Sequence, residues 1–494
     1  MSGPGLSGAC FIGGEWKAGS GAGFRSIAPA TSLAIWTGPE AAGPEVEEAV
    51  AAASAAFGAW RRTPVADRIA MVRRFARLVE AHKSDMTALI SRETGKPLWD
   101  AATETAAMIG KAELSAKAHA ERTPTRDVAT GALTARISHH PHGVMAVLGP
   151  FNFPGHLPNG HIMPALIAGN TVIFKPSEQT PAVAEFTVRL WEEAGAPAGV
   201  VNLLQGGRGP AEALVAHEGI DGVLFTGGLA TGRSIHRAFA GRIEKIVALE
   251  LGGNNPLVVW GAGDLDAAAR IIVKSAYVSS GQRCTCARRL IIPGGAEGKA
   301  ILEALSALID RLTVGPPDGD PQPFMGPVIS EAAAGEVLTA QAKWLRSGGA
   351  AIRESRQMEE LGGAFLSPGL IEVTAIDARE DEEVFGPLLQ VIRVGDFEWA
   401  MEEANNTKFG LAAGLISDDA SLFARFETEV RAGVLNWNRQ TTGASGAAPF
   451  GGVGLSGNHR PAGYFAADYS AWPMASLLAP GAVRDDEAIV GVRP

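Results

Sequence analysis

A short stretch with two cysteines is the first candidate for chemistry in this chain. Two of the three cysteines lie in Gly281-Gln282-Arg283-Cys284-Thr285-Cys286. Residues 276–280 have the pattern of a helix end and residues 289–292 that of a strand, so we expect Cys284 on the loop between them. A free thiol has a pKa of about 8.5, which positive neighbours such as Arg283 lower. Cys284 is therefore a candidate nucleophile, and a small buried hydrophobic residue is the alternative.

The second cysteine of the stretch, Cys286, is predicted to be a bystander. The Cys-x-Cys spacing could also indicate zinc. No second cysteine pair or nearby histidine completes a set of four ligands, so we expect no metal.

Two polar residues that follow predicted strands could assist a nucleophile. Glu250 ends the run 246–250, and a carboxylate in apolar surroundings is expected to have a raised pKa and to act as a general base. A helix cap or an ion pair is the alternative. Asn152 follows the strand 144–148, and its amide could donate to an oxyanion. Its alternative role is to satisfy its own backbone in a proline-rich turn.

Two other phrases at strand ends are suited to a nucleotide. Lys175 and Glu178 are three residues apart and could each bind a ribose hydroxyl, although a surface ion pair is the alternative. The phrase Phe225-Thr226-Gly227-Gly228-Leu229-Ala230-Thr231-Gly232 joins a strand to a helix. Its glycines would let backbone N–H groups approach a pyrophosphate, but the phrase lacks the usual Gly-x-Gly-x-x-Gly spacing.

The elements that must position these residues form two α/β units. Residues 44–120 have a helical pattern, and residues 121–141 partly alternate like a strand that leaves the domain. In each unit apolar strands alternate with helices, which indicates a parallel, doubly wound sheet with ligands at the carboxyl ends of its strands. The first unit has predicted strands at 144–148, 171–174, 200–204, 222–225 and 245–249, and helices at 158–168, 181–193, 209–216 and 232–240. The second has strands at 257–260, 289–292, 388–394, 412–416 and 433–436, and helices at 264–279, 299–312, 331–347, 399–405 and 421–430.

Composition excludes several other classes of protein. The chain has 494 residues and a net charge of −10, without a basic stripe, so we expect no nucleic-acid partner. No uninterrupted apolar run is long enough to cross a membrane, and the first 20 residues do not have the pattern of a signal peptide. Three cysteines do not form a disulfide framework, which favours a reducing, cytoplasmic compartment.

Seven phrases, in this order along the chain, resemble those of the aldehyde dehydrogenase superfamily, and the 34-residue interval between Glu250 and Cys284 also matches. They are Phe151-Asn152-Phe153-Pro154, Lys175-Pro176-Ser177-Glu178, Phe225-Thr226-Gly227, Glu250-Leu251-Gly252-Gly253, Gly281-Gln282-Arg283-Cys284, Glu383-Val384-Phe385-Gly386-Pro387 and Pro449-Phe450-Gly451-Gly452. The resemblance implies an α/β fold with a Rossmann-type cofactor domain, a second α/β catalytic domain and a small β oligomerisation arm. The implied boundaries are 1–120 and 142–252 for the NAD-binding domain, 253–445 for the catalytic domain, 121–141 and 463–480 for the arm, and 481–494 for a tail.

The resemblance also implies a role for each matching residue. Cys284 would attack an aldehyde, Asn152 would bind the oxyanion, and Glu250 would activate the water that releases the acid. The cofactor-binding residues would be Lys175 and Glu178 at the adenosine ribose, Phe225, Thr226, Gly227, Gly228 and Gly232 around the pyrophosphate, and Glu383 with Phe385 at the nicotinamide ribose. Since a carboxylate at Glu178 disfavours a 2′-phosphate, the expected cofactor is NAD. The arm implies a homodimer or homotetramer.

Three short phrases of the sequence most resemble those of superfamily members that oxidise a semialdehyde bearing carboxylates. These phrases are residues 155–161, 284–289 and 456–462. Cations should then line the substrate entry, and the candidates are Arg283, Arg439, His459 and Arg460, with Asn438 and Ser445 nearby in sequence. Arg283 is unusual for the superfamily and could instead lower the pKa of the thiol. Many relatives carry serine at the position of Gly228, so a pyrophosphate contact there would be made by backbone only.

Three other functions remain open from the sequence. One is an aldehyde dehydrogenase for another semialdehyde or a small aldehyde. A second is a coenzyme A-acylating enzyme of the same fold, which would not need the base Glu250. The third is a binding protein without catalysis, in which Cys284 would be inert.

Overall fold

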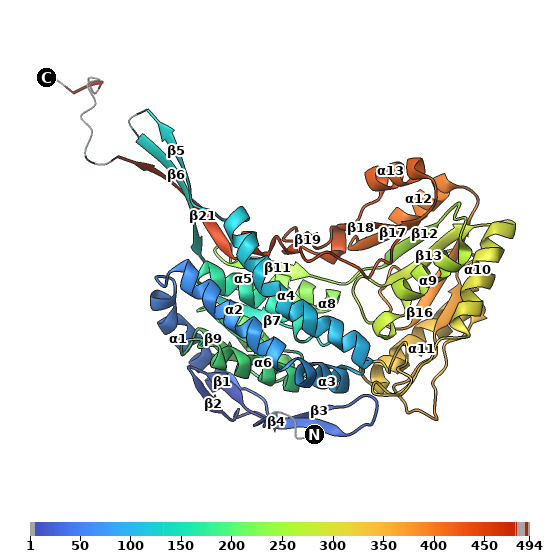
Figure 1. Cartoon of the computed structure of the whole chain (residues 1–494), viewed down its shortest axis with the longest axis horizontal. Helices are drawn as coiled ribbons and strands as arrows, with labels where there is room; N and C mark the ends of the chain where they lie inside the picture. The colour runs from blue at the N-terminus through green and yellow to red at the C-terminus, as the bar shows by residue number, and fades with distance from the viewer. Residues whose placement is uncertain (1–4, 132, 480, 482–489, 493–494) are drawn as a thin grey trace.

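The computed structural model describes residues 5–131, 133–479, 481 and 490–492, and Figure 1 shows the course of the chain. Two seven-stranded sheets with flanking helices form the body, and a three-stranded sheet extends away from it. This architecture agrees with the predicted α/β fold of two units and a small β arm. The tail predicted over 481–494 falls mostly outside the described residues.

The first sheet has the strand order β11-β10-β7-β8-β9-β1-β2, and its strands from β11 to β9 run parallel. The chain runs outward from β7 to β9 and then continues on the other side of β7, so the winding reverses between β7 and β10. Such a reversal is where ligands bind, beyond the carboxyl ends of the strands. The strands are β1 (Cys10–Ile12), β2 (Glu15–Lys17), β7 (Val144–Leu148), β8 (Thr171–Lys175), β9 (Val201–Leu203), β10 (Gly222–Thr226) and β11 (Ile246–Glu250).

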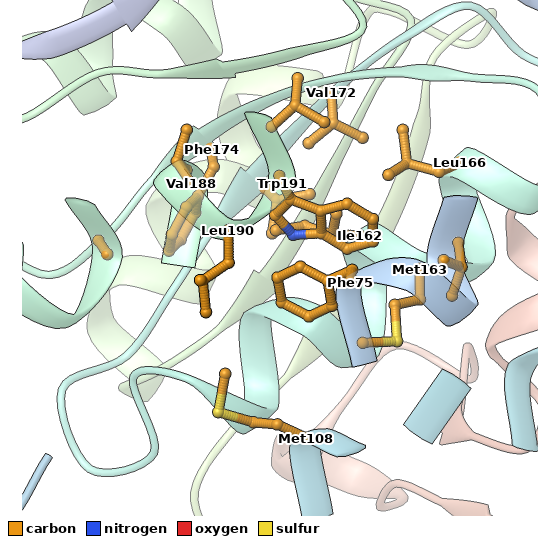
Figure 2. Close-up of a cluster of buried hydrophobic side chains, with 14 of the residues drawn as sticks. Phe75, Met108, Ile162, Met163, Leu166, Val172, Phe174, Val188, Leu190 and Trp191 are labelled. Atoms are coloured by element: carbon orange, nitrogen blue, oxygen red, sulfur yellow. The ribbon is translucent and has the colours of Figure 1, made fainter. Parts of the chain in front are cut away.

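Different helices cover the two faces of this sheet, because alternate residues of a strand point to opposite sides. Met145 and Val147 pack with helices α2 to α6, whereas Ala146 packs with α1, α7 and α8. Figure 2 shows the first cluster, in which the Phe75 and Trp191 rings stack with their centroids 3.9 Å apart. The helices are α1 (Gly43–Trp60), α2 (Val65–Ala81), α3 (Lys83–Thr94), α4 (Leu98–Arg122), α5 (His156–Ala168), α6 (Pro181–Glu193), α7 (Arg208–Ala216) and α8 (Leu229–Phe239).

The second sheet has the order β14-β15-β16-β13-β12-β17-β18 and is parallel except for β14. Its strands are β12 (Asn255–Val259), β13 (Ala287–Pro293), β14 (Ala350–Arg353), β15 (Gly369–Glu372), β16 (Leu388–Val394), β17 (Ala412–Ile416) and β18 (Val434–Trp437). Its helices are α9 (Leu265–Ala276), α10 (Gly295–Ile309), α11 (Glu331–Arg346), α12 (Phe397–Asn405) and α13 (Ala420–Glu429).

The chain passes from one sheet to the other through residues 251–254, which join the carboxyl end of β11 to the amino end of β12. The carboxyl edge of the first sheet therefore faces the amino edge of the second. Glu250 is the last residue of β11, and Cys284 precedes β13, the neighbour of β12. The topology thus brings a carboxylate from one sheet to the thiol of the other.

The extending arm is formed by β5 (Arg126–Thr130), β6 (Leu133–Pro141) and β21 (Ala471–Leu478), in the order β21-β6-β5 (Figure 1). Strands from the two segments predicted to form an arm, 121–141 and 463–480, share this sheet, whereas α14 of the second segment lies outside it. The remaining elements are β3 (Gly23–Ile27), β4 (Ala34–Pro39), β19 (Pro449–Phe450), β20 (Ala462–Gly463), α14 (Ala466–Tyr469) and short 3₁₀ turns at Val278–Gly281 and Gly454–Ser456. Within the described ranges, no helix has both the length and the apolar character of a membrane span.

Several predicted boundaries are wrong. The helix expected over 264–279 ends at Ala276, because Ser279 and Ser280 have φ angles of +54° that no α-helix accommodates. The helix expected over 232–240 begins at Leu229, with Gly228 as its N-cap. The strands β14 and β15 are not predicted from the sequence, because each has only four residues, too few for a periodic pattern.

Candidate active site

Cys284 lies on a loop that a buried asparagine holds in place. Its side chain is partly exposed, whereas Cys286 is buried. The Asn255 Nδ2 donates to the carbonyl oxygens of Cys284 at 2.7 Å and Cys286 at 2.8 Å, and its Oδ1 accepts from the Ala412 N–H at 3.0 Å. Asn255 is not predicted from the sequence, where its only signal is its position two residues after Gly252-Gly253. Asn255 therefore fixes the loop to the second sheet at the candidate nucleophile and two residues after it.

The turn before the loop is held in an unusual conformation. Ser279, Ser280 and Gly281 have positive φ angles of 54°, 54° and 71°. The Ser279 hydroxyl donates to Asp100 Oδ2 at 2.6 Å, and that of Ser280 to the Gly326 carbonyl at 2.7 Å. Residues with side chains adopt such angles only where the surroundings enforce them, commonly at functional sites. A Cβ on Gly281 would overlap the Gly386 carbonyl, so only glycine permits this close approach.

Arg283 is bound by other residues and does not lower the pKa of the Cys284 thiol. Its Nη2 donates to Asp100 Oδ1 at 2.6 Å and its Nε to Ser279 Oγ at 2.8 Å. The cation that acts on Cys284 is Arg288, which donates to the Gly281 carbonyl at 2.6 Å. The interpretation of Arg283 as the activating cation is therefore wrong, because Asp100 binds its guanidinium.

The expectation of a low thiol pKa is also wrong. Burial raises the pKa of Cys284 to about 12, the Glu383 and Glu250 carboxylates add to this effect, and Arg288 opposes it. Burial disfavours the charged form of any acid, and here it outweighs the single positive neighbour. Cys284 is thus a protonated thiol at neutral pH and needs a base in order to attack.

Glu250 is the candidate for that base. Its Oε2 is buried and has no hydrogen-bond partner among the described residues, and burial raises its pKa well above 4.5. The other nearby carboxylate, Glu383, is 3.4 Å from Arg288 Nη2. A Cβ on Gly451 would lie 2.7 Å from Glu250 Oε1, so glycine leaves room for the carboxylate. The predicted rise in pKa is confirmed, and the alternatives of a helix cap or an ion pair are wrong.

The Asn152 amide reaches the loop of the nucleophile. Its Nδ2 donates to the Gln282 carbonyl at 2.9 Å, two residues before Cys284. Its neighbour Phe151 packs edge to face on Phe385, with ring centroids 5.9 Å apart. The alternative that Asn152 only satisfies its own turn is wrong. The amide thus contacts the loop that carries Cys284.

The carboxyl edge of the first sheet has features that fit a dinucleotide. Lys175 is buried, and its Nζ donates to the carbonyls of Gly206 at 2.8 Å and Gly207 at 3.4 Å, so the alternative of a surface ion pair is wrong. Burial lowers the pKa of Lys175 to about 8. Glu178 is exposed three residues on. The ammonium and the carboxylate are thus at the strand end where a ribose would bind.

The N-terminus of α8 is open to a pyrophosphate. No atom lies within 4 Å of the position that a Cβ on Gly228 would occupy. Phe225 is buried beneath Gly227, where a Cβ would overlap its ring, and Gly232 packs against Leu251 inside the helix. The open backbone N–H groups at this end suit an anion.

Two further predicted residues, Thr226 and Glu383, lie against other segments of the chain. Thr226 Oγ1 lies 3.0 Å from His161 Nε2, and the other ring nitrogen lies 2.8 Å from Tyr469 Oη. Glu383 packs against Gly252, where a Cβ would overlap its carboxylate. Burial raises the pKa of Glu383, and Arg288 opposes that shift.

The remaining candidate cations are exposed. Gly457 pairs with Glu250, and Asn458 Oδ1 accepts from the Leu249 N–H at 2.9 Å, so the loop that continues into His459 and Arg460 lies beside β11. Among the described residues, no side-chain hydrogen bond joins Arg439 to β11. Arg439 is also exposed. Of nearby Asn438 and Ser445, the first accepts from the Ser417 N–H at 2.9 Å and the second from the Ala447 N–H at 3.3 Å.

Comparisons with known proteins agree on one family. Its model, described as the aldehyde dehydrogenase family, matches residues 16–472. The chain is 55% identical over 469 residues to the N-succinylglutamate 5-semialdehyde dehydrogenase of Hahella chejuensis, which covers 95% of this chain and 96% of that protein. A variant of 1-pyrroline-5-carboxylate dehydrogenase from Thermus thermophilus has a TM-score of 0.90 at 33% identity, covering 95% and 92%. The NADP-dependent glyceraldehyde-3-phosphate dehydrogenase of Bacillus halodurans, complexed with NADP, has a TM-score of 0.87 at 29% identity, covering 96% and 100%.

Proposed function

The chain belongs to the aldehyde dehydrogenase family, and we propose that it oxidises N-succinylglutamate 5-semialdehyde to N-succinylglutamate with NAD. The observation that carries this proposal is a partly exposed thiol whose pKa is raised by the charge of Glu250, a buried carboxylate with one oxygen that has no hydrogen-bond partner among the described residues. The similarity to the Hahella protein, over nearly the full length of both chains, supports the substrate. The proposed physiological setting is arginine catabolism.

In the proposed first step, the Cys284 thiol attacks the aldehyde carbon. Because the thiol is protonated at neutral pH, its proton passes to Glu250 Oε2, which has no hydrogen-bond partner among the described residues, as the bond between sulfur and carbon forms. The electron pair of the carbonyl bond moves to oxygen. The Asn152 amide and the backbone N–H of Cys284 would stabilise the resulting oxyanion by hydrogen bonds.

The proposed second step hydrolyses a thioester on Cys284. NAD, when bound, supplies the acceptor for the hydride that leaves the substrate carbon. Glu250 would release the thiol proton to solvent and, again a carboxylate, would take a proton from water as the water oxygen attacks the thioester carbon. The bond between carbon and sulfur breaks, the acid leaves, and a proton restores the Cys284 thiol.

Replacing Asn152 by alanine is expected to lower kcat/KM roughly 10²- to 10³-fold, because one donor to the oxyanion is lost. The affinity for NAD, measured by calorimetry, should remain unchanged. Steady-state NADH formation measures the effect. A loss of less than about threefold would remove Asn152 from the oxyanion site.

We propose NAD as the cofactor in a family that uses NAD or NADP. Lys175 and Glu178 would hold the adenosine ribose, Gly227 and Gly228 would approach the pyrophosphate, and Glu383 would hold the nicotinamide ribose. Phe225, Thr226, Gly232 and Phe385 would support these contacts through packing. In this division the first sheet with its helices holds the cofactor, and the second sheet carries the nucleophile.

Replacing Glu178 by glutamine is expected to lower the KM for NADP by about 5-fold, since an exposed charge contact is worth at most about 1 kcal/mol. The gain should shrink at high salt, which screens exposed charges. The matched control is Glu193→Gln, which removes another exposed carboxylate, on α6. An equal change in both variants, or a lower KM for NADP than for NAD in the wild type, would contradict the proposed preference.

The substrate itself is tested by NADH formation with N-succinylglutamate 5-semialdehyde, glutamate 5-semialdehyde and propanal. A kcat/KM at least about 10-fold higher for the succinylated aldehyde would support the proposal. Similar values for all three would leave an aldehyde dehydrogenase of broader specificity. Product formation that requires coenzyme A would instead favour the acylating alternative.

We further propose a cytoplasmic homo-oligomer. The cysteines Cys10, Cys284 and Cys286 are all free, in keeping with a reducing compartment. The arm of β5, β6 and β21 exposes Val128, Ile137 and Leu477 on its strands, a surface suited to a second copy of the chain. Light scattering would distinguish a dimer from a tetramer.

A further inference from the structure

One buried lysine beside α5 has no partner among the described residues. Lys111 of α4 is only 5% exposed, yet its Nζ forms no ion pair or hydrogen bond with any residue that the structure describes. Burial lowers its pKa to about 8. A lysine that is mostly buried and has no carboxylate partner would be stabilised by an anion that reaches its ammonium.

The other cations around the nucleophile are already paired. Lys96 Nζ lies 2.7 Å from the Glu104 carboxylate, Arg283 Nη2 lies 2.6 Å from Asp100, and Arg288 Nη2 lies 3.4 Å from Glu383. Lys111 therefore differs from them in lacking a carboxylate. A substrate with carboxylates would supply the missing charge.

The position of Lys111 connects it with the candidate active site. A Cβ on Gly160 would lie 3.7 Å from Lys111 Cε and 3.9 Å from its Nζ, so the ammonium lies over α5. His156, one turn earlier on the same face of α5, has a buried Nδ1 without a partner among the described residues. The helix follows directly after the turn that carries Asn152.

The protonation state of His156 makes its imidazole a neutral hydrogen-bonding group. Burial lowers its pKa to about 3, and the charges of Lys111 and Lys96 add to this effect. The imidazole is thus neutral at pH 7 and can donate one hydrogen bond. Its ring is only partly buried, so it borders accessible space.

We propose that Lys111 and His156 form the subsite that binds a carboxylate of the substrate. The ammonium would supply the charge and the imidazole an additional hydrogen bond, on the helix that follows Asn152. This subsite rests on the proposed function, and it replaces Arg283 as the principal cation for the substrate. The neutral aldehyde propanal does not need it.

The kinetic test compares Lys111→Gln with the wild type. For N-succinylglutamate 5-semialdehyde, kcat/KM should fall roughly 30-fold or more, mainly through KM, because one partner of a buried charge pair is removed. For propanal it should change less than about 2-fold, which also shows that the variant is folded. Lys111→Arg, which keeps the charge, should recover much of the loss. The matched control is Lys117→Gln, which removes an exposed lysine of the same helix that pairs with Glu121.

The loss of kcat/KM on glutamate 5-semialdehyde, which lacks the succinyl group, identifies which carboxylate of the substrate binds at Lys111. A loss on this substrate as well would assign the α-carboxylate to Lys111, and a loss confined to the succinylated substrate would assign the succinyl carboxylate. Equal losses on propanal and on the carboxylated aldehydes, or no loss on any, would overturn the subsite.

A binding test keeps this inference separate from the proposed function. Succinate should bind the wild-type enzyme in calorimetry, and its Kd should rise at least 10-fold in Lys111→Gln but not in Lys117→Gln. If the wild type shows no preference for the succinylated aldehyde, the proposed substrate is wrong, but selective succinate binding would still support the subsite. Identical succinate binding by the wild type and Lys111→Gln would overturn it.

Discussion

Replacing Cys284 by alanine is expected to lower dehydrogenase activity roughly 10⁴-fold or more, because no other group in the site can form the covalent intermediate. The partly exposed Cys284 is the only one of the three cysteines that is not buried in the described structure. The rate of NADH formation under saturating aldehyde and NAD measures the loss. Binding of NAD should be retained, since the residues proposed to hold it lie mainly on the first sheet.

The other two cysteines provide matched controls. Cys10→Ala removes a thiol buried beside Gln205, and Cys286→Ala removes one buried two residues from the nucleophile. Both variants should keep kcat within about threefold of the wild type. Activity that survives in Cys284→Ala, or that is lost equally in Cys286→Ala, would contradict the assignment of the nucleophile.

Replacing Glu250 by glutamine is expected to stall the enzyme after its first turnover. If Glu250 is the base for thioester hydrolysis, kcat should fall about 10²- to 10⁴-fold. Stopped-flow absorbance should still show up to one NADH per active site in a burst, since the hydride leaves before hydrolysis. The burst itself should be slower than in the wild type, because Glu250 also accepts the thiol proton. A variant with full steady-state turnover would exclude Glu250 as the base.

The pH dependence of the wild type provides a second test of Glu250. Burial raises its pKa well above 4.5, and the base must be the carboxylate, so hydrolysis should accelerate as the pH rises through this raised pKa. The residual hydrolysis in Glu250→Gln should lack this limb. A wild-type profile that is already flat at pH 5 would show that the carboxylate is ionised there and would contradict the raised pKa.

The candidate site residues at the ends of strands could be predicted from the sequence. Glu250 and Lys175 each follow an apolar run, and parallel strands bring their carboxyl ends to one edge. The loop position of Cys284 could be predicted in the same way, from the change of pattern around it. The periodic pattern of apolar residues can predict these positions, because strand ends and loops depend on residues that are neighbours in the chain.

Contacts between distant segments could not be predicted from periodicity. Asp100 binds Arg283 across 183 positions, and this contact changes the interpretation of Arg283. The raised pKa of Cys284 depends on burial and on the charges of Glu383 and Glu250, which are distant in sequence and which no local pattern predicts. Lys111 and Lys117 lie on the same helix, and only the packing of α4 on α5 distinguishes a buried lysine from an exposed one.

The most direct test of this account is to identify the trapped intermediate. Glu250→Gln would be mixed with N-succinylglutamate 5-semialdehyde and NAD, quenched in acid, digested, and mapped by mass spectrometry. The account predicts an N-succinylglutamyl group on Cys284, with Cys10 and Cys286 unmodified and nearly one NADH formed for each acyl group. NADH formation without any acylated cysteine, or acylation at another cysteine, would contradict it.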